Sequence, residues 1–495
     1  MARVSTPFDL PLTPFEKQPR EKLRGEDGTY PYGYADDDQI TTAEERAFVR
    51  KIDLMILPII CTINFMQFLD KTTINYASML DFKSDLKIDG YQYSTIASIF
   101  YLGYLLYQVP NNYLLQVVPL GRYIGLIVFI WGLVLLCHGF GQNFSQLVAM
   151  RFLLGLFEAG IYPALTILVS TFYRRAEQPT RLGVVWLCNG VAMILGGAIT
   201  YGIKRMPDNH GLAGWRWIMF ILGGITCVLG IIAFFFLIDN PKSKYLRLNA
   251  EQEILVEERT RDNAVVRTTV VKREQIKEAL KETRLWAFCF ACLAFNLGNG
   301  GLTIYSTQIV NAFGYDEYNS ILLTMPAGVL DIVFILLGVY LVYRIRQTLY
   351  VACAVMMTGT LGMLLMVVIP QTKLKLIGQY ITYSYTPTYV LMLASISNNV
   401  SGYTKKIFYN SVMMIFYTVG NFIGPFVMNV ETTPKYAGGF IIYICCNVVG
   451  VILLLFARWR MAIVNRRRLA RSPGEVTNVE DDLTDVQDPN FIYRL

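Results

Sequence analysis

Long apolar segments, separated by short polar ones, make up most of the chain. A helix needs about 20 apolar residues to cross the hydrocarbon core of a bilayer. Segments of this length recur throughout residues 53–457. The pattern therefore predicts twelve transmembrane helices, near 53–77, 93–117, 122–140, 146–172, 182–203, 216–238, 285–310, 319–341, 348–369, 376–397, 407–429 and 437–457.

A charged stretch separates the sixth span from the seventh. Six spans, a polar linker and six further spans form the layout of transporters built from two related halves. We therefore predict an all-α membrane protein with two six-helix halves. Its parts are a cytosolic N-terminal tail (1–52), the N-terminal half (53–239), a cytosolic linker (240–284), the C-terminal half (285–457) and a cytosolic C-terminal tail (458–495).

Composition supports a membrane protein and argues against other classes. Apolar residues make up 54% of the chain and charged residues only 16%, whereas about a quarter of a soluble domain is charged. The net charge of +7 comes from basic residues beside the apolar spans, so we expect a lipid bilayer and no nucleic acid as partner. The cysteines lie mostly in apolar segments without metal-ligand spacing. We expect no metal and no cofactor.

The positions of lysine and arginine predict the orientation in the membrane. If both termini are cytosolic, the short cytosolic loops together hold eight basic residues and the short outer loops also hold eight. The short loops alone therefore do not determine the orientation. The linker adds eleven, and the run from Arg458 to Arg471 adds more on the same side. Because cytosolic segments are enriched in lysine and arginine, we expect both termini and the linker in the cytosol.

Several segments together resemble one known family. They are LDKTTINYA (69–77), YLGYLLYQVPNNYLLQVVPLGRYIG (101–125), RFLLGLFEAGIYPALT (151–166), FYRRAEQPTR (172–181), GWRWIMFILGGITCVLG (214–230), NLGNGG (296–301), SNNVSGYTKK (397–406) and YTVGNFIGP (417–425). In this order they are similar to the fungal anion:cation symporter family of the major facilitator superfamily, which includes allantoate, nicotinate and pantothenate permeases. The resemblance covers Asp53 to about Arg458. It implies the major facilitator fold, transport of a small organic anion by a monomeric carrier, and the plasma membrane.

One family signature is incomplete. Facilitators usually carry glycine, three residues, Asp-Arg, one residue and Gly-Arg between spans two and three. Here Gly121-Arg122 remains, while Val118-Pro119 stands in place of the Asp-Arg pair. The corresponding loop of the second half also lacks the acid. The missing acids place in question the charge pairs that many facilitators form at these loops.

The fourth span contains two ionisable residues. An ionisable group at the bilayer centre costs about 2.5 to 3.5 kcal/mol on insertion scales, so each one suggests a function. Arg151 and Glu158 are seven residues apart, which places them on one helix face about 10 Å apart. This spacing resembles a pair in organic-anion facilitators, including the vesicular glutamate and sialic acid carriers. We expect Arg151 to bind a substrate carboxylate and Glu158 to carry the coupling proton. The alternatives are an interfacial anchor for Arg151 and a structural ion pair for Glu158.

Other ionisable residues lie in spans one and eight. Asp70 and Lys71 are adjacent near the end of span one, so they point about 100° apart and are expected to have different partners. They form either an ion pair at the rim or part of the substrate and proton passage. Asp331 in span eight is either a second proton-coupling residue or the partner of a cytosolic-side arginine. His138 and His210 are expected in outer loops.

Polar residues in three further spans are candidates for substrate binding. Span seven combines asparagines with three glycines in the segment NLGNGG. Glycine-weakened helices near the midplane free backbone groups that can bind a solute, although the same composition is also typical of close helix packing. The candidates are Asn296 and Asn299 in span seven, Asn189 in span five, and Tyr417 and Asn421 in span eleven.

These observations predict a proton-coupled symporter for a small organic anion or vitamin-like carboxylate, working by alternating access. Glu158, Asp331 and Asp70 are the candidates for proton coupling, and Arg151 and Lys71 join the polar residues above as candidates for substrate binding. The alternatives are an exporter or a carrier of a cationic or zwitterionic solute, and a nutrient sensor with the same fold. The sequence contains no phosphate loop, metal cluster or nucleophile elbow, so an enzyme is not expected.

The predicted topology can be tested by chemical labelling. Cysteines introduced at Glu258 and Pro489 should resist membrane-impermeant thiol reagents in intact cells, because both positions are expected in the cytosol. Labelling should appear once the cells are permeabilised. Ready labelling of either cysteine from outside would reverse the orientation.

Overall fold

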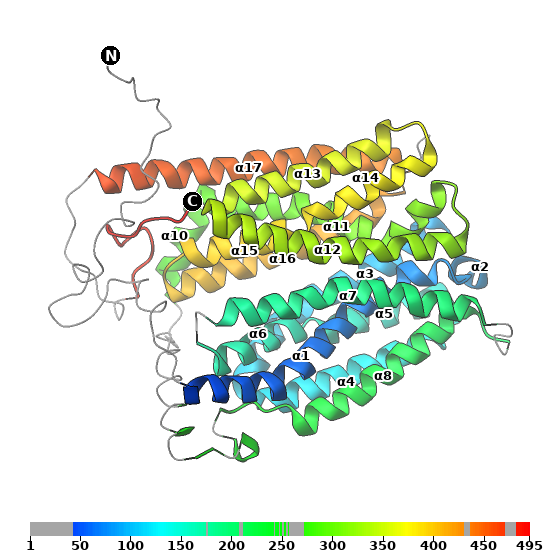
Figure 1. Ribbon diagram of the computed structural model, residues 1–495, viewed down its shortest axis with the longest axis horizontal. Coiled ribbons are helices and arrows are strands. Elements are labelled where there is room, and N and C mark those ends of the chain that lie inside the picture. Colours follow the sequence, from blue (N-terminus) through cyan, green and yellow to red (C-terminus); the bar gives the residue numbers. More distant parts are fainter. Residues whose placement is uncertain are drawn as a thin grey trace.

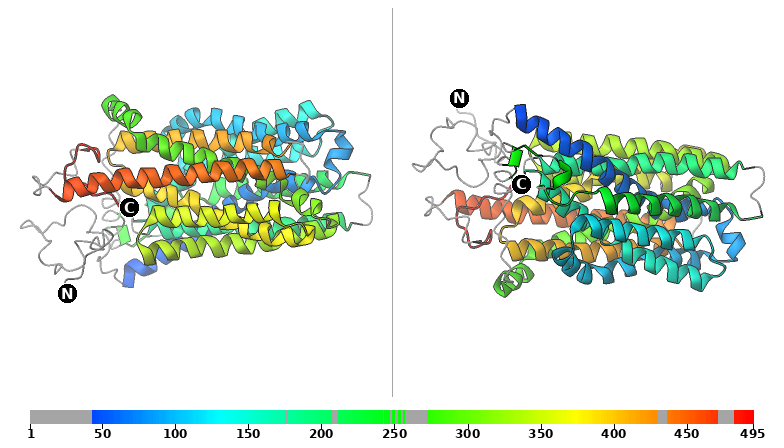
Figure 2. Two further views of the ribbon diagram at one scale, coloured as in Figure 1. Left: turned by 90° about the horizontal axis from the view of Figure 1, so that it is seen from above. Right: turned by 90° about the horizontal axis from the view of Figure 1, so that it is seen from below.

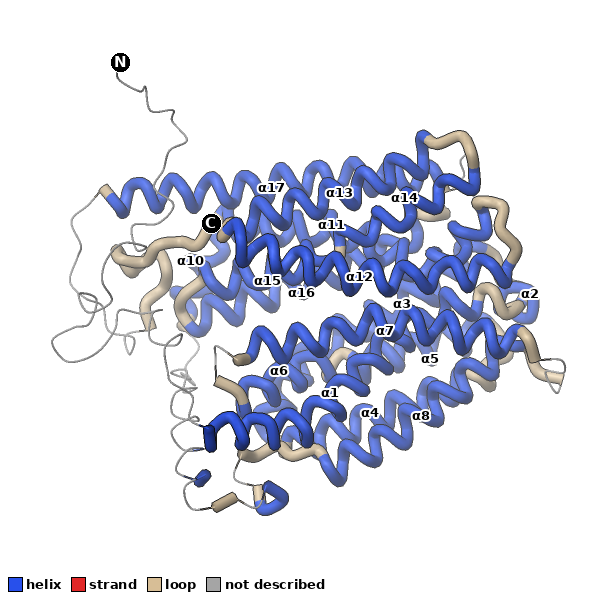
Figure 3. Tube along the Cα trace, viewed as in Figure 1, coloured by secondary structure: helices blue, strands red, loops and turns tan. Residues whose placement is uncertain are grey.

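The computed structural model is a bundle of long helices (Figure 1). It describes residues 43–495 except 175–176, 207–210, 242, 247, 250–251, 254–255, 257–271, 430–435 and 471–481. The predictions for residues 1–42, for His210 and for most of the linker therefore lie outside the described residues. Figure 3 shows helices joined by loops, and no strand occurs among the residues that are described.

The long helices follow the order of the predicted spans. They are α1 (Ala43–Ala77), α3 (Gly90–Val117), α4 (Leu120–His138), α5 (Phe144–Glu158), α6 (Ile161–Phe172), α7 (Gln178–Lys204), α8 (Gly214–Phe236), α11 (Thr283–Ala312), α12 (Glu317–Ile345), α13 (Thr348–Val368), α14 (Lys375–Thr382), α15 (Pro387–Asn399), α16 (Tyr403–Val427) and α17 (Ala437–Leu469). Two short helices lie outside the spans, namely α2 (Phe82–Leu86) and α10 (Arg273–Lys281).

The lengths and compositions of these helices suit a bilayer. Within the described chain, 10 helical segments are long and apolar enough to cross a membrane. Two further predicted spans are less apolar or interrupted. α3 has 28 residues but contains polar side chains such as Gln108 and Asn111. The span over 375–399 is divided into α14 and α15 by a 3-10 turn at Tyr383–Tyr385.

The helices pack according to the same scheme twice. α1 packs on α7 and α4 on α8, and later in the chain α11 packs on α16 and α13 on α17. Counted as spans, these pairs are one with five and three with six, then seven with eleven and nine with twelve. We call α1 to α8 the first half and α11 to α17 the second half, which lies above the first in Figure 1.

Contacts between the halves also follow one rule. α3 contacts α16, α7 contacts α12, and α1 contacts α11. As spans these are two with eleven, five with eight, and one with seven. In the two halves, span two corresponds to span eight and span five to span eleven. The contact of two with eleven is therefore equivalent to the contact of eight with five, as expected for repeats related by a two-fold axis.

The two ends of the bundle differ. The terminal end holds the start of α1, α10 and the C-terminus, and the opposite end holds α2 (Figures 1 and 2). Where both partners are described, every hydrogen bond that joins the two halves lies at the end with α2. Examples are Asn75 Nδ2 to Ser306 Oγ at 2.8 Å and Tyr318 to the Lys204 carbonyl at 3.2 Å. We call this end the closed end.

The fourth predicted span is two helices rather than one. α5 ends at Glu158 and α6 begins at Ile161. The intervening Gly160 lies where a Cβ atom would be 2.9 Å from Asn111 Oδ1 and 3.0 Å from the Tyr123 hydroxyl. A side chain at this position would therefore crowd side chains of α3 and α4, and the interruption directly follows the candidate proton carrier.

Glycines bring the two halves into backbone contact near the middle of α7 and α12. A Cβ on Gly190 would lie 2.5 Å from the Gly328 carbonyl oxygen, and a Cβ on Gly328 would lie 2.4 Å from the Gly190 carbonyl oxygen. Contacts this short exclude any larger residue without movement of a helix. In membranes, such small-residue contacts let helices approach closely.

The C-terminal segment Asp482–Leu495 packs against the terminal end of the second half. Asp485 is fully buried and contacts Arg284 Nη2 at 2.6 Å and Lys405 Nζ at 2.9 Å. The Tyr493 hydroxyl donates to Asp485 Oδ2 at 2.7 Å. Burial alone would raise the pKa of Asp485, but Arg284 and Lys405 lower that pKa more, so the net shift is downward. Asp485 is therefore ionised at neutral pH.

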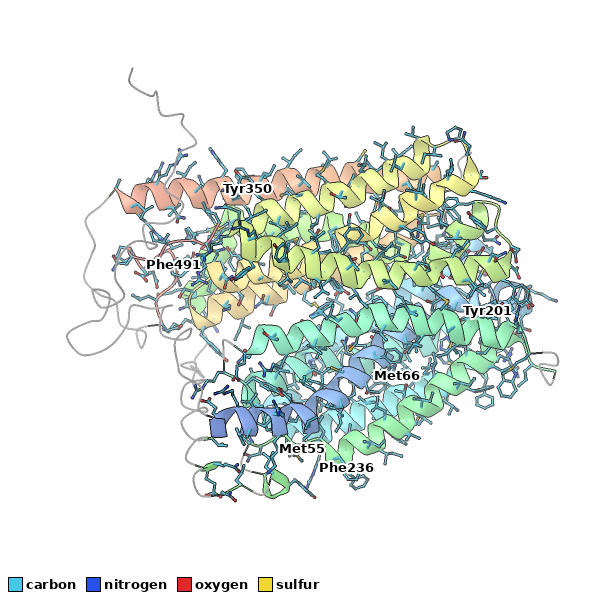
Figure 4. All side chains as sticks on the ribbon, viewed as in Figure 1. Met55, Met66, Tyr201, Phe236, Tyr350 and Phe491 are labelled. Atoms are coloured by element: carbon cyan, nitrogen blue, oxygen red, sulfur yellow. The ribbon has the colours of Figure 1, made fainter. Side chains whose placement is uncertain are left out.

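Side chains fill the space between the ribbons over the full length of the bundle (Figure 4). Met66 of α1 is labelled near the middle of the first half, Phe491 at the terminal end and Tyr201 at the closed end. Met66 is almost completely buried. The residues that follow it in α1 include Asp70 and Lys71, so these charges lie well inside the bundle.

The α7–α12 contact predicts a difference between two alanine variants of one helix. Gly190→Ala should lower the melting temperature of the detergent-purified protein, because overpacking costs about 1–3 kcal/mol. Gly183→Ala is the matched control, since its Cβ would meet nothing within 4 Å and alanine favours a helix by up to about 1 kcal/mol. Equal melting temperatures for the two variants would contradict the contact.

Candidate functional site

A buried ion pair lies at the centre of the first half. Lys71 of α1 places its Nζ atom 3.5 Å from Oε1 of Glu158 at the end of α5. The Glu158 side chain has no solvent-exposed surface, while that of Lys71 is 19% exposed. Both carboxylate oxygens of Glu158 lack a hydrogen-bond donor among the described residues. The contact is therefore a loose ion pair.

The neighbouring Asp70 belongs to a different set of contacts. The Trp131 indole Nε1 donates to Asp70 Oδ2 at 2.6 Å. Thr73 Oγ1 lies 3.4 Å from Asp70 Oδ1 and accepts a hydrogen bond from Arg151 Nη2 at 3.2 Å. Asp70 and Arg151 also attract each other electrostatically. As their adjacent positions in the helix predict, Asp70 and Lys71 have different partners.

The local sequence explains how four charges become two pairs. Adjacent residues of α1 point to different sides, so one carboxylate and one amine face different parts of α5. Arg151 and Glu158 are separated by nearly two turns of α5. Arg151 approaches Asp70 through Thr73, and Glu158 pairs with Lys71. The spacing of Arg151 and Glu158 leaves room for a substrate group, a water or a neighbouring helix between them, and the structure places the neighbouring helix α1 beside both.

Aromatic rings surround Lys71. Its Nζ atom lies 5.9 Å from the centre of the Phe100 ring and 5.6 Å from that of Tyr104, both in α3. The Tyr417 hydroxyl of α16 is within electrostatic range of both Lys71 and Glu158. The pair therefore faces the second half as well as the first, which is the position a solute between the halves would occupy.

More rings continue this aromatic shell across the two halves. Trp186 of α7 packs edge-on against Tyr162, with the ring centres 5.5 Å apart, and against Tyr389 of α15, with the ring centres 6.4 Å apart. The ring centres of Tyr389 and Tyr417 are in turn 5.1 Å apart. The hydroxyl and indole groups offer hydrogen bonds, and the ring faces suit a flat solute. Tyr417 was a predicted candidate, but the other rings were not.

The asparagines of spans seven and eleven bind mainly one another. Asn299 Nδ2 donates to Asn421 Oδ1 at 2.9 Å, and Asn421 Nδ2 donates to Asn296 Oδ1 at 2.9 Å. Asn296 and Asn421 are completely buried, whereas Asn299 is half-buried and accepts a bond from Tyr385 at 3.1 Å. Asn299 is therefore the member of this ladder best placed to reach a solute.

The glycines of span seven do not weaken the helix. α11 runs without interruption from Thr283 to Ala312. A Cβ on Gly300 would lie 2.7 Å from the Asn421 carbonyl oxygen, and one on Gly301 would collide with the Tyr443 hydroxyl. The glycines of this segment therefore serve close helix packing. They do not free backbone groups for a solute, because the helix is continuous here.

Asn189 and Asp331 have different surroundings. The Asn189 side chain accepts a hydrogen bond from Asn64 of α1 at 2.9 Å, so it joins α7 to α1 within the first half. Asp331 is buried in α12 beside the interruption of span ten. Within the described part of the chain, no lysine or arginine forms an ion pair with Asp331. This argues against a cytosolic-side arginine as its partner.

Two residues near the site were missed or misplaced by the sequence analysis. His138 was expected in an outer loop, but it ends α4, is fully buried and lies within electrostatic range of Arg151. Neither of its ring nitrogens has a hydrogen-bond partner among the described residues. Trp131 was not considered, because one tryptophan in an apolar span carries no signal of its own. The seven-residue spacing of Trp131 and His138 on α4, two turns, was the only available hint.

Comparison with known proteins identifies the class that this fold and site define. The sequence pattern of the Major Facilitator Superfamily matches residues 60–428. The chain belongs to the Major Facilitator Superfamily. It is therefore a membrane transporter and not an enzyme, and its substrate is a small molecule.

The most informative relatives are fungal. The chain is 30% identical to the allantoate permease of Saccharomyces cerevisiae, over 93% of this chain and 88% of that protein. It is 28% identical to a thiamine pathway transporter of the same yeast, over 93% of this chain and 90% of the relative. It is also 33% identical to an uncharacterised transporter of Schizosaccharomyces pombe, over 93% and 90% of the two chains.

Solved structures confirm the predicted fold. A bacterial homologue of the human lysosomal transporter Spinster, in an inward-facing conformation, has a TM-score of 0.60 at 14% identity, covering 81% of this chain and 95% of that chain. A D-xylose–proton symporter has a TM-score of 0.59 at 13% identity, covering 83% and 97%. At these identities the likeness establishes the fold alone.

The asparagine ladder predicts opposite outcomes for two leucine variants. Asn421→Leu should reduce the amount of folded carrier in the membrane, because the buried Asn296 Oδ1 loses its donor, at about 1–3 kcal/mol, and the Asn299 amide loses its acceptor. Asn299→Leu should keep abundance near normal and weaken solute affinity about two- to tenfold. The checks are fluorescence-detected size-exclusion chromatography and saturation of uptake. Loss of protein without any change in affinity for Asn299→Leu would assign Asn299 to packing as well.

Proposed function

We propose that the protein is a proton-coupled symporter for a small organic anion or vitamin-like carboxylate. The observation that supports this best is the buried Lys71–Glu158 pair, whose acid lacks a hydrogen-bond donor among the described residues. The similarity to an allantoate permease favours an anionic solute. The aromatic shell favours a solute with a flat, conjugated body.

In this proposal Lys71 exchanges one carboxylate for another. A solute carboxylate that reaches Lys71 competes with Glu158 for the same ammonium group. Once displaced, Glu158 is a buried carboxylate without a counter-charge, and burial favours its protonated form. Solute binding and proton binding therefore promote each other, and release of either favours release of the other.

Charge balance sets the expected stoichiometry. The side chains of the site include two acids and two bases, namely Asp70, Glu158, Lys71 and Arg151, whose formal charges sum to zero. One monoanion and one proton leave this sum unchanged, whereas either alone would bury a net charge at a cost of several kcal/mol. We therefore propose one proton per monovalent anion and electroneutral transport.

Arg151 has a different role in this arrangement. Arg151 is 2% exposed, and its guanidinium group approaches Asp70 through Thr73. We assign it to fixing Asp70, and hence the turn of α1 that carries Lys71, while Lys71 makes the first contact with the carboxylate. Asp331 remains a second candidate for proton coupling, because it is buried without an ion-pair partner among the described residues.

The expected topology determines which side of the membrane each end of the bundle faces. With both termini in the cytosol, the closed end faces outward and the terminal end faces inward. The structure then corresponds to an inward-facing carrier in the plasma membrane, acting as a monomer. Two alternatives are a carrier of a cationic or zwitterionic solute, which the aromatic rings would also accept, and a sensor with the same fold. Uptake of labelled solutes into vesicles separates these three functions.

Glu158→Gln tests proton coupling. The amide imitates a permanently protonated acid of the same shape, so the variant should lose uphill, pH-driven uptake. It should retain exchange of solute across the membrane, because exchange needs no release of the proton. Proteoliposomes with an imposed pH gradient provide the measurement. Unchanged pH-driven accumulation would exclude Glu158 and move the assignment to Asp331 or Asp70.

The two bases should respond differently to substitution. Lys71→Gln should abolish carboxylate uptake, because the solute loses its counter-charge. Arg151→Lys keeps the charge but loses the planar fork, so it should lower the melting temperature and leave the Michaelis constant within about threefold. A large rise of the Michaelis constant for Arg151→Lys, with normal stability, would return the carboxylate contact to Arg151.

A further inference from the structure

The closed end is held by a dense set of hydrogen bonds between the halves, and one side chain makes most of the bonds between α1 and α11. Asn75 Nδ2 donates to Ser306 Oγ at 2.8 Å. Asn75 Oδ1 accepts from the Thr307 hydroxyl at 2.7 Å and from the Thr307 backbone N–H at 3.1 Å. The Thr307 hydroxyl also lies 3.1 Å from the Asn75 carbonyl oxygen. Asn75, Ser306 and Thr307 are all buried.

A second group of bonds surrounds this contact. Ser94 Oγ lies 2.7 Å from the Tyr305 hydroxyl and donates to the Pro425 carbonyl at 3.0 Å. Asn429 Nδ2 donates to Ser94 Oγ at 2.8 Å. The Tyr93 hydroxyl lies 3.0 Å from the carbonyl oxygens of Ile74 in one half and Ile304 in the other. These contacts use uncharged groups on both sides.

We propose that Asn75 is the latch of the closed end and sets the balance between the two conformations of the carrier. All the hydrogen bonds of the Asn75 side chain cross between the halves, so opening the closed end breaks them together. None of these partners lies at the terminal end. The Asn75 contacts therefore stabilise only the conformation seen here, in which the closed end is shut.

This role has a definite sign. A group that interacts in one conformation and not in the other shifts the equilibrium by its differential free energy. Removing the Asn75 amide should weaken the closed end and populate the conformation in which that end opens and the terminal end closes. The closed end also holds charged contacts between the halves, namely Lys204 with Glu317 and Lys83 with Gln308. The bonds of Asn75 itself involve no ionised group, so the difference between Asn75→Ala and the unchanged protein should be the same at pH 5.5 and pH 8. The inference requires only two alternating conformations, and it does not depend on which solute or ion the carrier moves.

Hydrogen–deuterium exchange of the full-length protein in nanodiscs, without added solute, tests this latch. In Asn75→Ala, peptides from the start of α3 and the start of α12, at the closed end, should exchange about five- to tenfold faster. Peptides from the start of α7 and the start of α16, at the terminal end, should exchange more slowly. The opposite signs at the two ends distinguish a shift of conformation from a general loosening.

Asn447→Ala is the matched control. Asn447 is a buried asparagine of α17 that donates to Thr360 at 3.2 Å within the second half. Its loss should not produce opposite changes at the two ends. Thr307→Val removes the hydroxyl partner while keeping the volume of the side chain, and it should act like Asn75→Ala with a smaller effect. It also serves if Asn75→Ala does not fold.

Faster exchange at both ends, or no change at the closed end, in Asn75→Ala and Thr307→Val would overturn the assignment. The assignment would also be overturned if Asn447→Ala produced the same opposite changes at the two ends as Asn75→Ala and Thr307→Val. Transport measurements play no part in this decision. A failure of proton coupling at Glu158 would therefore leave the latch untouched, and a failure of the latch would leave the coupling proposal untouched.

Discussion

The constraint on which the structure depends is that charges removed from water must be balanced. Asp70, Lys71, Arg151 and Glu158 lie inside a bundle whose outer face is apolar. An unpaired ion there would cost several kcal/mol. Two acids and two bases on α1 and α5 solve this problem, because Glu158 pairs with Lys71 and Asp70 lies within electrostatic range of Arg151. A charged solute that binds here must be accompanied by a compensating change of charge, because an additional buried net charge is costly.

The rest of the first half can be understood as support for these four residues. The break between α5 and α6 directly follows Glu158, which reaches Lys71, and Gly160 allows close contact with Asn111 and Tyr123. Trp131 on α4 gives the Asp70 carboxylate an N–H donor at 2.6 Å. One pair is thereby held by hydrogen bonds and the other is left loose. This asymmetry is the basis for proposing exchange at the Lys71–Glu158 pair and not at Asp70.

The sequence was sufficient for the spans and the family because both depend on local information. A stretch of about 20 apolar residues predicts a membrane helix without knowledge of its neighbours. Partners depend on how helices rotate and slide against one another, and here the prediction was incomplete. Asn296 and Asn421 were expected to bind solute but bind each other across α11 and α16. His138 was placed in a loop because its position at the end of a span did not show that the neighbouring helices bury it.

The docked C-terminus could not be predicted for a related reason. Asp485 lies in a polar tail that carries no hydrophobic signal, yet it is buried between Arg284 and Lys405. Those two bases are far from each other and from Asp485 in the sequence, and only the fold brings them together. The loop acids that this chain lacks are thus not the only way to pair bases at the terminal end. A tail can supply the carboxylate instead.

The helix α1 connects the exchangeable pair to the closed end. Lys71 and Asn75 are four residues apart, so they lie on the same face, about 6 Å apart along the helix axis. The change of partner that we propose at Lys71 would therefore take place one turn from the side chain that joins α1 to α11. Any rotation of α1 that moves Lys71 toward a solute must also move Asn75 relative to Ser306 and Thr307. Solute binding and opening of the closed end thus act on the same rigid element, which is the physical requirement for coupling them.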